Sequence, residues 1–456
     1  MKHQIVVIGG GSAGYAAART ARDAGAEVAI VDCGPLGGLC ILRGCMPTKT
    51  ILASAAVMAR MRRGPEFGLL PVEPRADLAA IISRKDRLVR EFAEYRIEQL
   101  RDPRFTLYEE PAAFLSPNSL QVGSRVVEAD RFVIATGSVP HLLAVPGLSE
   151  TGYLTSDEAL ELRRQPASML VLGGGPVALE LAQFFQRLGT RVTLVQRSPH
   201  VLSHEDEDLA VPLEEALRAE GMEVLTGTRL LGFSREEGLA VVRLIHRDRE
   251  VVLRAETVLQ AAGRRPDLDG LNLVASGVAV EEGRVLVDAE MRTSQPHIFA
   301  VGDVNGLHEI VHIAILQGEV AGHNAALPDR PPKAVDDRLN ARVTFTDPQV
   351  ASVGLSERAC RERGEPYLAA SYPFADHGKA ICLGETHGQV KLLCRPGTGE
   401  LIGGHIVGPE AGELLHELIA VMHFHGTVHD LLAMPHYHPT LAEILTYPAE
   451  ELAGHL

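Results

Sequence analysis

The sequence predicts an α/β protein made of two Rossmann-like dinucleotide-binding domains and a C-terminal α+β domain. Residues 4–32 read as a strand, a glycine turn, a helix and a second strand, which is the pattern of a dinucleotide-binding unit. The same pattern returns over residues 169–196. Beyond a proline-containing linker from Leu327 to Lys333 the pattern changes, and segments 341–345, 390–394 and 401–407 resemble strands of a separate unit.

The first unit gives each of its glycines a physical task. Gly9 makes the tight turn after the strand, Gly11 lets a pyrophosphate approach the backbone, and Gly14 lets the helix pack on the strand. The helix N-terminus then faces the phosphates. Asp32, at the end of the second strand, is placed to accept hydrogen bonds from a ribose.

The second unit repeats the first at a fixed interval. Four positions each stand 164 residues after Gly9, Gly11, Gly14 and Asp32, namely Gly173, Gly175, Ala178 and Gln196. Two such units in one chain imply two bound dinucleotides.

A segment with two cysteines, from Gly37 to Lys49, lies beside the first unit. Cys40 and Cys45 are separated by four residues. Five residues of regular helix rise about 7.5 Å, whereas a disulfide needs Cα atoms within roughly 7 Å, so a bridge requires a distorted turn. Strained and accessible bridges are the reducible ones. We interpret the pair as a redox-active disulfide, with a structural bridge or two free thiols as the alternative, and a redox pair beside a dinucleotide suggests FAD together with NAD(P).

Composition excludes several classes of partner. There are 59 acidic and 44 basic residues, the net charge is −15, and no basic run occurs, so neither nucleic acid nor an anionic membrane is an expected partner. No apolar run approaches the length of a membrane span, and the N-terminus does not resemble a signal peptide. Six cysteines without a secretory signal favour a cytoplasmic protein.

Two motifs carry a resemblance to a known family. The run from Gly37 to Lys49 resembles the redox segment, Gly-Gly-x-Cys-x4-Cys-x-Pro-Ser-Lys, of class I flavin-dependent pyridine nucleotide–disulfide oxidoreductases, with Thr48 in place of the usual Ser. The run from His436 to Glu443 resembles the His-x-His-Pro-Thr-x-x-x-Glu motif of dihydrolipoamide dehydrogenases. The resemblance extends over essentially the whole chain, as a divergent branch.

The resemblance implies the cofactors and the residues that hold them. The first unit would take FAD, and Lys49 would lie beside flavin N5 with Glu180 as its partner. Asp303 would bind the ribityl chain, after the run from Thr293 that resembles the second flavin motif. The chain would cross between domains at Thr136, Gly137 and Gly263. NAD(P) would be held by Gly173, Gly175, Ala178, Gln196 and Arg197.

The resemblance also implies the domain plan. The FAD domain is expected at residues 1–145 and 270–330, the NAD(P) domain at 146–269, and a dimerisation domain at 335–456. In this family the C-terminal histidine serves the disulfide of the partner subunit. A homodimer with a composite active site is therefore expected.

Thiol–disulfide exchange needs a proton-transfer group, and the C-terminal motif supplies one. By resemblance, His438 is the acid/base and Glu443 orients it. Cys40 would exchange with the substrate dithiol, and Cys45 would form a charge-transfer thiolate with the flavin. The region is rich in histidine, so metal binding and a buried core histidine are alternatives, but no third ligand has zinc-like spacing and no metal site is predicted.

The favoured function is an FAD-dependent dithiol/disulfide oxidoreductase similar to dihydrolipoamide dehydrogenase, with a lipoyl group as the expected substrate. One alternative is an NADPH-dependent reductase of glutathione or another low-molecular-weight disulfide. A second is a flavin NAD(P)H:quinone or metal-ion reductase. Mercuric reductases carry a late cysteine pair that is absent after Cys394.

Two departures bear on substrate choice. Gln196 and Arg197 stand where NAD-specific enzymes place an acid that repels a 2′-phosphate, which favours NADP(H) or dual use. Arg43, inside the cysteine loop, is suited to an anionic substrate or to lowering a thiol pKa.

Overall fold

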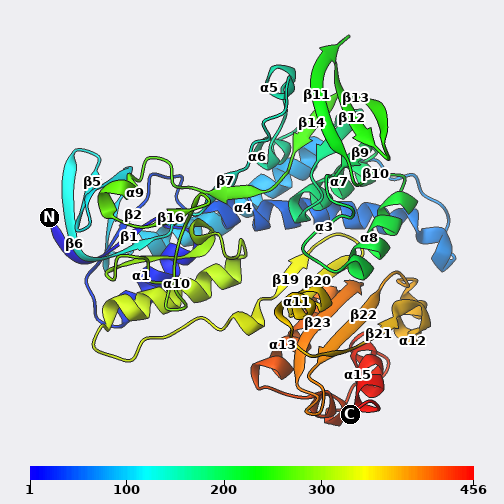
Figure 1. Cartoon of the computed structure of the whole chain (residues 1–456). Coiled ribbons are helices and arrows are strands. Elements are labelled where there is room, and N and C mark those ends of the chain that lie inside the picture. The colour runs from blue at the N-terminus through cyan, green and yellow to red at the C-terminus, as the bar shows by residue number, and fades with distance from the viewer. The chain divides into compact units, whose positions relative to one another are not determined.

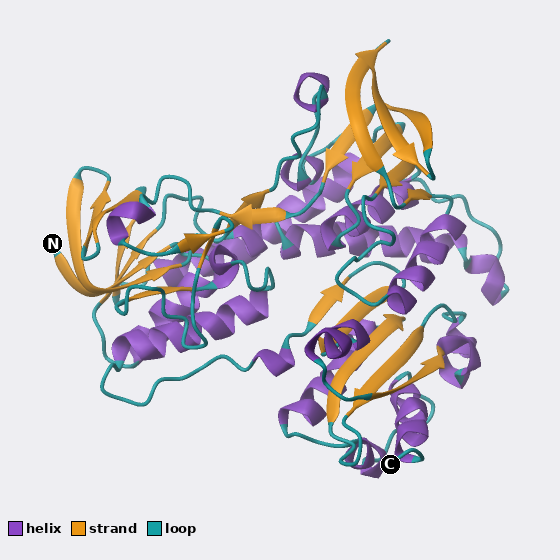
Figure 2. Cartoon of the chain, in the orientation of Figure 1, coloured by secondary structure: helices purple, strands orange, loops and turns teal.

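The computed structural model describes residues 1–456 and shows a mixed α/β chain (Figures 1 and 2). It divides into two compact units. The first unit comprises residues 1–50, 82–141 and 263–336, and the second comprises residues 51–81, 142–262 and 337–456. This division into two units does not test the three predicted domains, which remain a prediction.

The first unit is built on a seven-stranded sheet with the path β3-β2-β1-β6-β5-β4 and with β18 paired to β6. The strands are β1 (Lys2–Ile8), β2 (Val28–Val31), β3 (Phe105–Tyr108), β4 (Ala112–Ser116), β5 (Ser119–Val122), β6 (Arg125–Ile134) and β18 (Ile298–Ala300). Strands β3, β2, β1, β6 and β18 are parallel, and β5 and β4 extend the sheet as antiparallel strands. The parallel part is the dinucleotide-binding core that the sequence predicts.

Two helices, α1 (Ser12–Asp23) and α10 (Val311–Ala326), pack against each other in this unit (Figure 1). Their backbones approach closely at two glycines of α10. A Cβ atom on Gly318 would lie 2.3 Å from the carbonyl oxygen of Ala13, and one on Gly322 would lie 2.4 Å from that of Ala17. Only glycine permits this spacing.

The second unit contains a four-stranded parallel sheet in the order β10-β9-β8-β14, next in the chain to an antiparallel three-stranded sheet. The strands of the first sheet are β8 (Ser168–Leu172), β9 (Arg191–Val195), β10 (Glu223–Leu225) and β14 (Thr257–Gln260), and its helices are α7 (Pro176–Leu188) and α8 (Glu207–Ala219). The antiparallel strands are β11 (Arg229–Glu236), β12 (Leu239–His246) and β13 (Arg249–Ala255).

The C-terminal part of the second unit is a five-stranded antiparallel sheet in the order β19-β20-β23-β22-β21. Its strands are β19 (Arg342–Thr344), β20 (Gln349–Gly354), β21 (Leu368–Pro373), β22 (Gln389–Cys394) and β23 (Leu401–Gly408). Helices α13 (Ala411–His423), α14 (Val428–Ala433) and α15 (Thr446–Ala453) share one apolar core with it.

The remaining elements are either short or, in the case of two longer helices, have residues in both units. The longer ones are α3 (Cys45–Arg62) and α4 (Leu78–Leu100), and the short ones are α2 (Leu39–Leu42), α5 (Leu148–Thr151), α6 (Ser156–Ala159), α9 (Leu273–Ser276), α11 (Glu357–Arg363), α12 (Gly378–Leu383), β7 (Ser138–Pro140), β15 (Arg264–Pro266), β16 (Val280–Glu281) and β17 (Arg284–Val285). The predicted fold class is confirmed. The antiparallel β11–β13 sheet was not predicted, because no functional motif marks its strands.

Candidate redox active site

The first glycine turn has the geometry that a bound dinucleotide requires. Gly9 has φ +105°, and a Cβ there would lie 2.3 Å from the carbonyl oxygen of Ala135. A Cβ on Gly14 would lie 1.9 Å from the carbonyl oxygen of Gly9, whereas one on Gly11 would meet only Gly38 Cα at 3.9 Å. The turn therefore leaves the backbone at the start of α1 bare, as phosphate binding needs.

Asp32 follows β2 and braces this turn. Its Oδ2 accepts a hydrogen bond from Gly10 N at 2.6 Å, and its Oδ1 accepts one from Gly34 N at 2.7 Å. Each carboxylate oxygen has two acceptor sites, so both retain one for ribose hydroxyls. The residues of the first dinucleotide-binding motif, 4–32, therefore fit a bound dinucleotide.

Asp303 lies in a hydrogen-bonded group that includes two residues the sequence analysis did not assign to the site. Asp303 Oδ2 accepts from Ser138 Oγ at 2.5 Å, and Arg264 Nε donates to the same hydroxyl at 2.8 Å. Burial and the neighbouring Asp303 raise the pKa of Glu309. Ser138 and Arg264 end the two segments predicted to cross between domains, so their positions were visible in the sequence but their contact was not.

The crossing residues Thr136 and Gly137 both bond to Asp267. Thr136 Oγ1 donates to the carbonyl oxygen of Asp267 at 2.6 Å, and Asp267 N donates to the carbonyl oxygen of Gly137 at 2.9 Å. Gly137 and Gly263 have φ +76° and +109°, in the region that favours glycine. These contacts close the turn beside the first dinucleotide unit.

The second glycine turn reproduces the first. A Cβ on Gly173, at φ +122°, would lie 2.3 Å from the carbonyl oxygen of Ala261, and one on Gly175 would meet nothing within 4 Å. Ala178 is buried where the helix packs. The residues therefore fit a second dinucleotide.

No acidic residue follows β9, the second strand of the second dinucleotide-binding unit, where Gln196 and Arg197 stand. Gln196 Oε1 accepts from Arg197 N at 3.1 Å, and the Arg197 side chain is exposed. An exposed guanidinium at this position suits a phosphate.

The cysteine segment breaks its helix as the spacing predicts. Helix α2 ends at Leu42 and α3 begins at Cys45, with Arg43 at φ −139° between them. Cys40 and Cys45 are thiols, both half-buried, and their side chains are hydrogen-bonded. This hydrogen bond, followed by burial, raises the pKa of the Cys40 thiol far above its usual range, and the Lys49 ammonium opposes the shift. The two sulfur atoms are close enough to interact directly.

A cation that no motif marks also lies near Cys40. Arg96, on α4, stacks its guanidinium over the Tyr15 ring at 4.3 Å. Burial lowers the pKa of Arg96, and negative charge on Tyr15 or on Cys40 would raise it. Arg19, on α1, forms an ion pair with Glu319 of α10 at 2.6 Å.

The proposed acid/base pair is formed in the second unit. His438 Nδ1 lies 2.9 Å from Glu443 Oε1, and Glu443 Oε2 accepts from Thr440 N at 2.8 Å. The hydrogen bond from Thr440 N, and to a lesser extent the one with His438, lowers the pKa of Glu443. A carboxylate on Nδ1 fixes the proton there and leaves Nε2 of the exposed ring to exchange protons with a substrate.

The neighbouring histidine has a different environment. His436 Nε2 lies 2.7 Å from Glu417 Oε1, and its side chain is only 10% exposed. It is held within the domain. No group of three or more His, Cys, Asp or Glu side chains has the arrangement of a metal site.

Two predicted pairings join residues of different units. Cys40, Cys45 and Lys49 belong to the first unit, and Glu180, His438 and Glu443 to the second. Glu180 is buried, and its Oε1 accepts from Phe345 N at 2.9 Å. The Lys49–Glu180 pair and the approach of His438 to a cysteine pair stay predictions.

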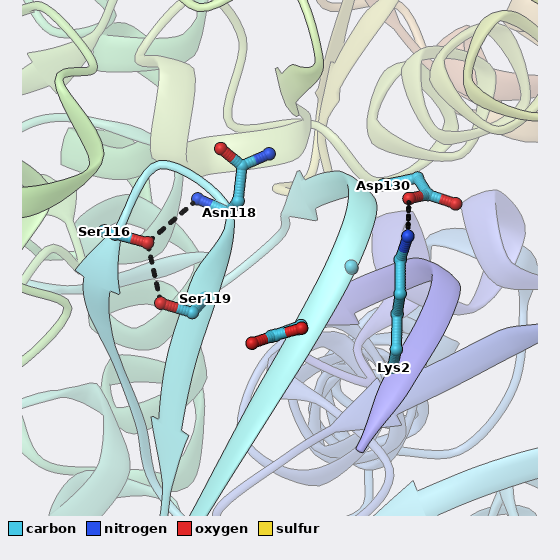
Figure 3. A pocket seen from close by; sticks show the side chains of 7 residues that line it. Lys2, Ser116, Asn118, Ser119 and Asp130 are labelled. Carbon is cyan, nitrogen blue, oxygen red and sulfur yellow. Dashed lines mark hydrogen bonds and ion pairs between the residues drawn. The ribbon is translucent and has the colours of Figure 1, made fainter.

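A small pocket at the edge of the first sheet contains none of the predicted site residues (Figure 3). Its volume is about 220 Å³. Four of its polar side chains are paired with one another, Lys2 with Asp130 at 2.7 Å and Ser116 with Ser119 at 2.7 Å. We assign it no ligand.

Comparison with known proteins identifies the family. Residues 3–318 match the pyridine nucleotide-disulphide oxidoreductase family, and residues 340–449 match the dimerisation domain of the same family. The chain therefore belongs to the pyridine nucleotide-disulphide oxidoreductases. These are FAD-containing enzymes that use NAD(P)H, so the chain is a flavoprotein disulfide oxidoreductase with a dimerisation domain.

The relatives of this chain include enzymes with different activities. A mercuric reductase of Staphylococcus aureus is 34% identical over 425 residues, which cover 92% of this chain and 77% of that protein. A dihydrolipoyl dehydrogenase of Bacillus subtilis is 33% identical over 425 residues, 92% of each chain. Among solved structures, a Cu(II) complex of the HOCl-induced flavoprotein disulfide reductase RclA from Escherichia coli has a TM-score of 0.87 at 26% identity and covers 99% of this chain and 100% of that one. These comparisons settle the family.

The chain has no helix with both the length and the apolar composition that crossing a lipid bilayer would require.

Proposed function

We propose that the protein is a dihydrolipoamide dehydrogenase-like enzyme that moves electrons between a dithiol, the Cys40–Cys45 pair, FAD and NAD(P). The observation that carries the proposal is the exposed His438 with its Nδ1 on Glu443, in a chain that also holds two thiols at a broken helix. Thiol–disulfide exchange requires these two elements together, a reactive sulfur pair and a proton-transfer group.

When Cys40 and Cys45 are bridged, a substrate dithiol exchanges with their disulfide in two steps. One substrate thiolate attacks Cys40 Sγ, the Cys40–Cys45 bond breaks, and Cys45 leaves as a thiolate. The second substrate thiolate then attacks the substrate sulfur of the mixed disulfide, and Cys40 leaves. His438 accepts one proton from the substrate dithiol, and the second proton passes to Cys40, which leaves as a thiol while Cys45 stays a thiolate. The substrate is oxidised to a disulfide and the cysteine pair is reduced by the same two electrons.

The remaining residues support cofactor binding. Gly9, Gly11, Gly14, Asp32 and Asp303 would hold FAD, and Lys49 would place a positive charge near the flavin ring. Bound FAD supplies the two-electron chemistry that links Cys45 to the nicotinamide. Gly173, Gly175 and Ala178 would hold the second dinucleotide, and the exposed Arg197 supports NADP(H) use.

A metal-ion reductase is the second candidate. The mercuric reductase relatives and the Cu(II) complex of the E. coli neighbour favour it. The absence of a cysteine pair after Cys394 weighs against mercury as the substrate. The His438–Glu443 pair makes the dithiol the better-supported substrate, and a glutathione-type disulfide reductase shares the same exchange chemistry.

The test is a steady-state assay of lipoamide and glutathione disulfide with NADH and NADPH, together with the Cys45→Ser variant. We expect turnover of at least one disulfide by the wild type and none by Cys45→Ser. Cys382→Ser, at an exposed cysteine outside the pair, should keep full activity. A wild type that reduces Cu(II) or Hg(II) but no disulfide would overturn the proposal.

A further inference from the structure

A row of polar side chains crosses four adjacent strands of the C-terminal sheet. Arg342 of β19 pairs with Ser352 of β20, Ser352 pairs with His405 of β23, and His405 pairs with Lys391 of β22. Directly paired residues point to the same face of a sheet. Ser352, His405 and Lys391 are 2%, 1% and 1% exposed, so these three side chains are covered, whereas Arg342 at the end of the row is exposed.

An acidic segment covers this row. Ser352 Oγ donates to Glu205 Oε2 at 2.6 Å, and Arg342 Nε lies 3.6 Å from Glu205 Oε1. Lys391 Nζ lies 2.9 Å from Asp206 Oδ2 and 2.8 Å from Asp208 Oδ1. The row and the segment are complementary in charge.

Lys391 is the centre of this contact. Glu357 adds a third carboxylate oxygen at 3.3 Å from its ammonium. Burial alone would lower the pKa of Lys391, but the hydrogen bonds and charges of Asp208 and Asp206 raise it. A buried ammonium keeps its charge only with such partners, and removing one member leaves the others uncompensated.

The backbone of the same segment is held as well. Arg358 donates to the carbonyl oxygens of Ser203 at 2.9 Å and His204 at 2.7 Å. Asp206 accepts from the backbone N of Glu357 at 3.0 Å and of Arg358 at 3.2 Å. Residues 203–208 are therefore fixed both to the C-terminal sheet, through Ser352 and Lys391, and to the start of helix α11.

Residues 203–208 follow β9, the second strand of the second dinucleotide-binding unit, after a loop that carries Arg197. Between Arg197 and Asp206 the chain is tied back at Leu202, whose N donates to the carbonyl oxygen of Gly174 at 2.8 Å. Val201 N donates to Glu214 Oε1 at 2.9 Å. The loop that carries Arg197 is thus held at the glycine turn and, farther along, by the polar row.

We propose that Lys391 and Asp206 are positioning residues for nucleotide binding: by anchoring residues 203–208 to the C-terminal sheet, they place Arg197 against the 2′-phosphate of NADP(H). This inference rests on the proposed use of NADP(H). It assigns the C-terminal sheet a part in nucleotide selectivity, because Lys391, which fixes the end of the loop, belongs to β22 and not to the second dinucleotide-binding unit.

The test measures binding of 2′,5′-ADP and 5′-AMP to the FAD-loaded enzyme by calorimetry, for the wild type and Lys391→Met. We expect the wild type to prefer 2′,5′-ADP and Lys391→Met to bind it about tenfold more weakly. KM for NADPH should rise while kcat at saturation is kept. Flavin reduction by dihydrolipoamide without nucleotide should be unchanged, which a general loss of structure would not allow.

Asp206→Asn provides a second variant if Lys391→Met does not fold, and it should weaken 2′,5′-ADP in the same direction. Arg243→Met is the matched control, because Arg243 forms an exposed ion pair with Glu250 in the same unit. Equal wild-type affinity for the two probes would refute NADP(H) use and the inference with it. A wild-type preference that both variants retain would overturn the inference alone.

Discussion

One carboxylate, that of Glu443, determines which nitrogen of His438 faces outward. Its two oxygens are used by different donors, the imidazole Nδ1 and the backbone N of Thr440. Because these contacts lower the pKa of Glu443 from 4.5, the carboxylate stays charged at neutral pH. The contribution of the contacts to stability is present above the unfolded-state pKa and is lost as the pH falls through the lowered folded-state value.

Glu443→Gln should therefore impair catalysis more than folding. Without the negative charge the histidine loses its fixed tautomer, and we expect kcat for dithiol oxidation to fall about tenfold to hundredfold. The measurement is kcat against pH with dihydrolipoamide. Glu417→Gln is the matched control, because that carboxylate binds His436 at a similar distance, 2.7 Å. Equal losses in the two variants would contradict the assignment of His438.

We propose that nucleotide preference depends on the residues that follow β9 (Arg191–Val195). Gln196→Glu places an acid where it would repel a 2′-phosphate and bond a 2′-hydroxyl. The ratio of kcat/KM for NADPH to that for NADH should fall by about tenfold or more. Arg191→Gln, at an exposed position on the same strand, should leave the ratio unchanged. An unaltered ratio in Gln196→Glu would show that this position does not read the ribose.

At the scale of elements, the sequence predicts those structures whose physical cause is local. The two glycine turns follow from residue type and spacing, and the structure shows the same close approach to a carbonyl oxygen at Gly9 and Gly173. The distorted turn between Cys40 and Cys45 also follows from local geometry. The contact of Ser138 with Asp303 and the polar row at Lys391 depend on segments far apart in sequence, so no local pattern indicates them.

The packing of α1 on α10 is a further non-local feature, and it can be tested. Gly322→Ala should destabilise the protein by about 1–3 kcal/mol, despite the better helix propensity of alanine, because the new Cβ would lie 2.4 Å from the Ala17 carbonyl oxygen. Thermal unfolding should show a midpoint lower by several degrees. Gly378→Ala is the control, since its Cβ would meet nothing within 4 Å. A midpoint raised by Gly322→Ala would mean that the helices separate without cost.

At the scale of the whole molecule, the predicted chemistry needs residues that one chain places in different units. The thiols of Cys40 and Cys45 lie in the first unit, and the His438–Glu443 pair lies in the second. The chain carries the dimerisation domain of its family over residues 340–449. The family resemblance predicts that the histidine of one chain serves the cysteine pair of its partner, and the alternative is a site completed within each chain.

Mixed dimers distinguish these arrangements. A dimer of one Cys45→Ser subunit and one His438→Gln subunit, purified through two different affinity tags, contains one normal cysteine pair and one normal histidine. If the site is composite, these two residues meet at one site and the other site has both defects, so activity should be about half that of the wild-type dimer. If each chain completes its own site, every site has one defect and the mixed dimer should be as inactive as either parent. The control is a dimer with both substitutions on one subunit and none on the other, for which the two expectations are reversed. Each composite site would then lack one residue, so the dimer should be inactive. Sites completed within one chain would leave one subunit intact, so activity should be about half that of the wild type.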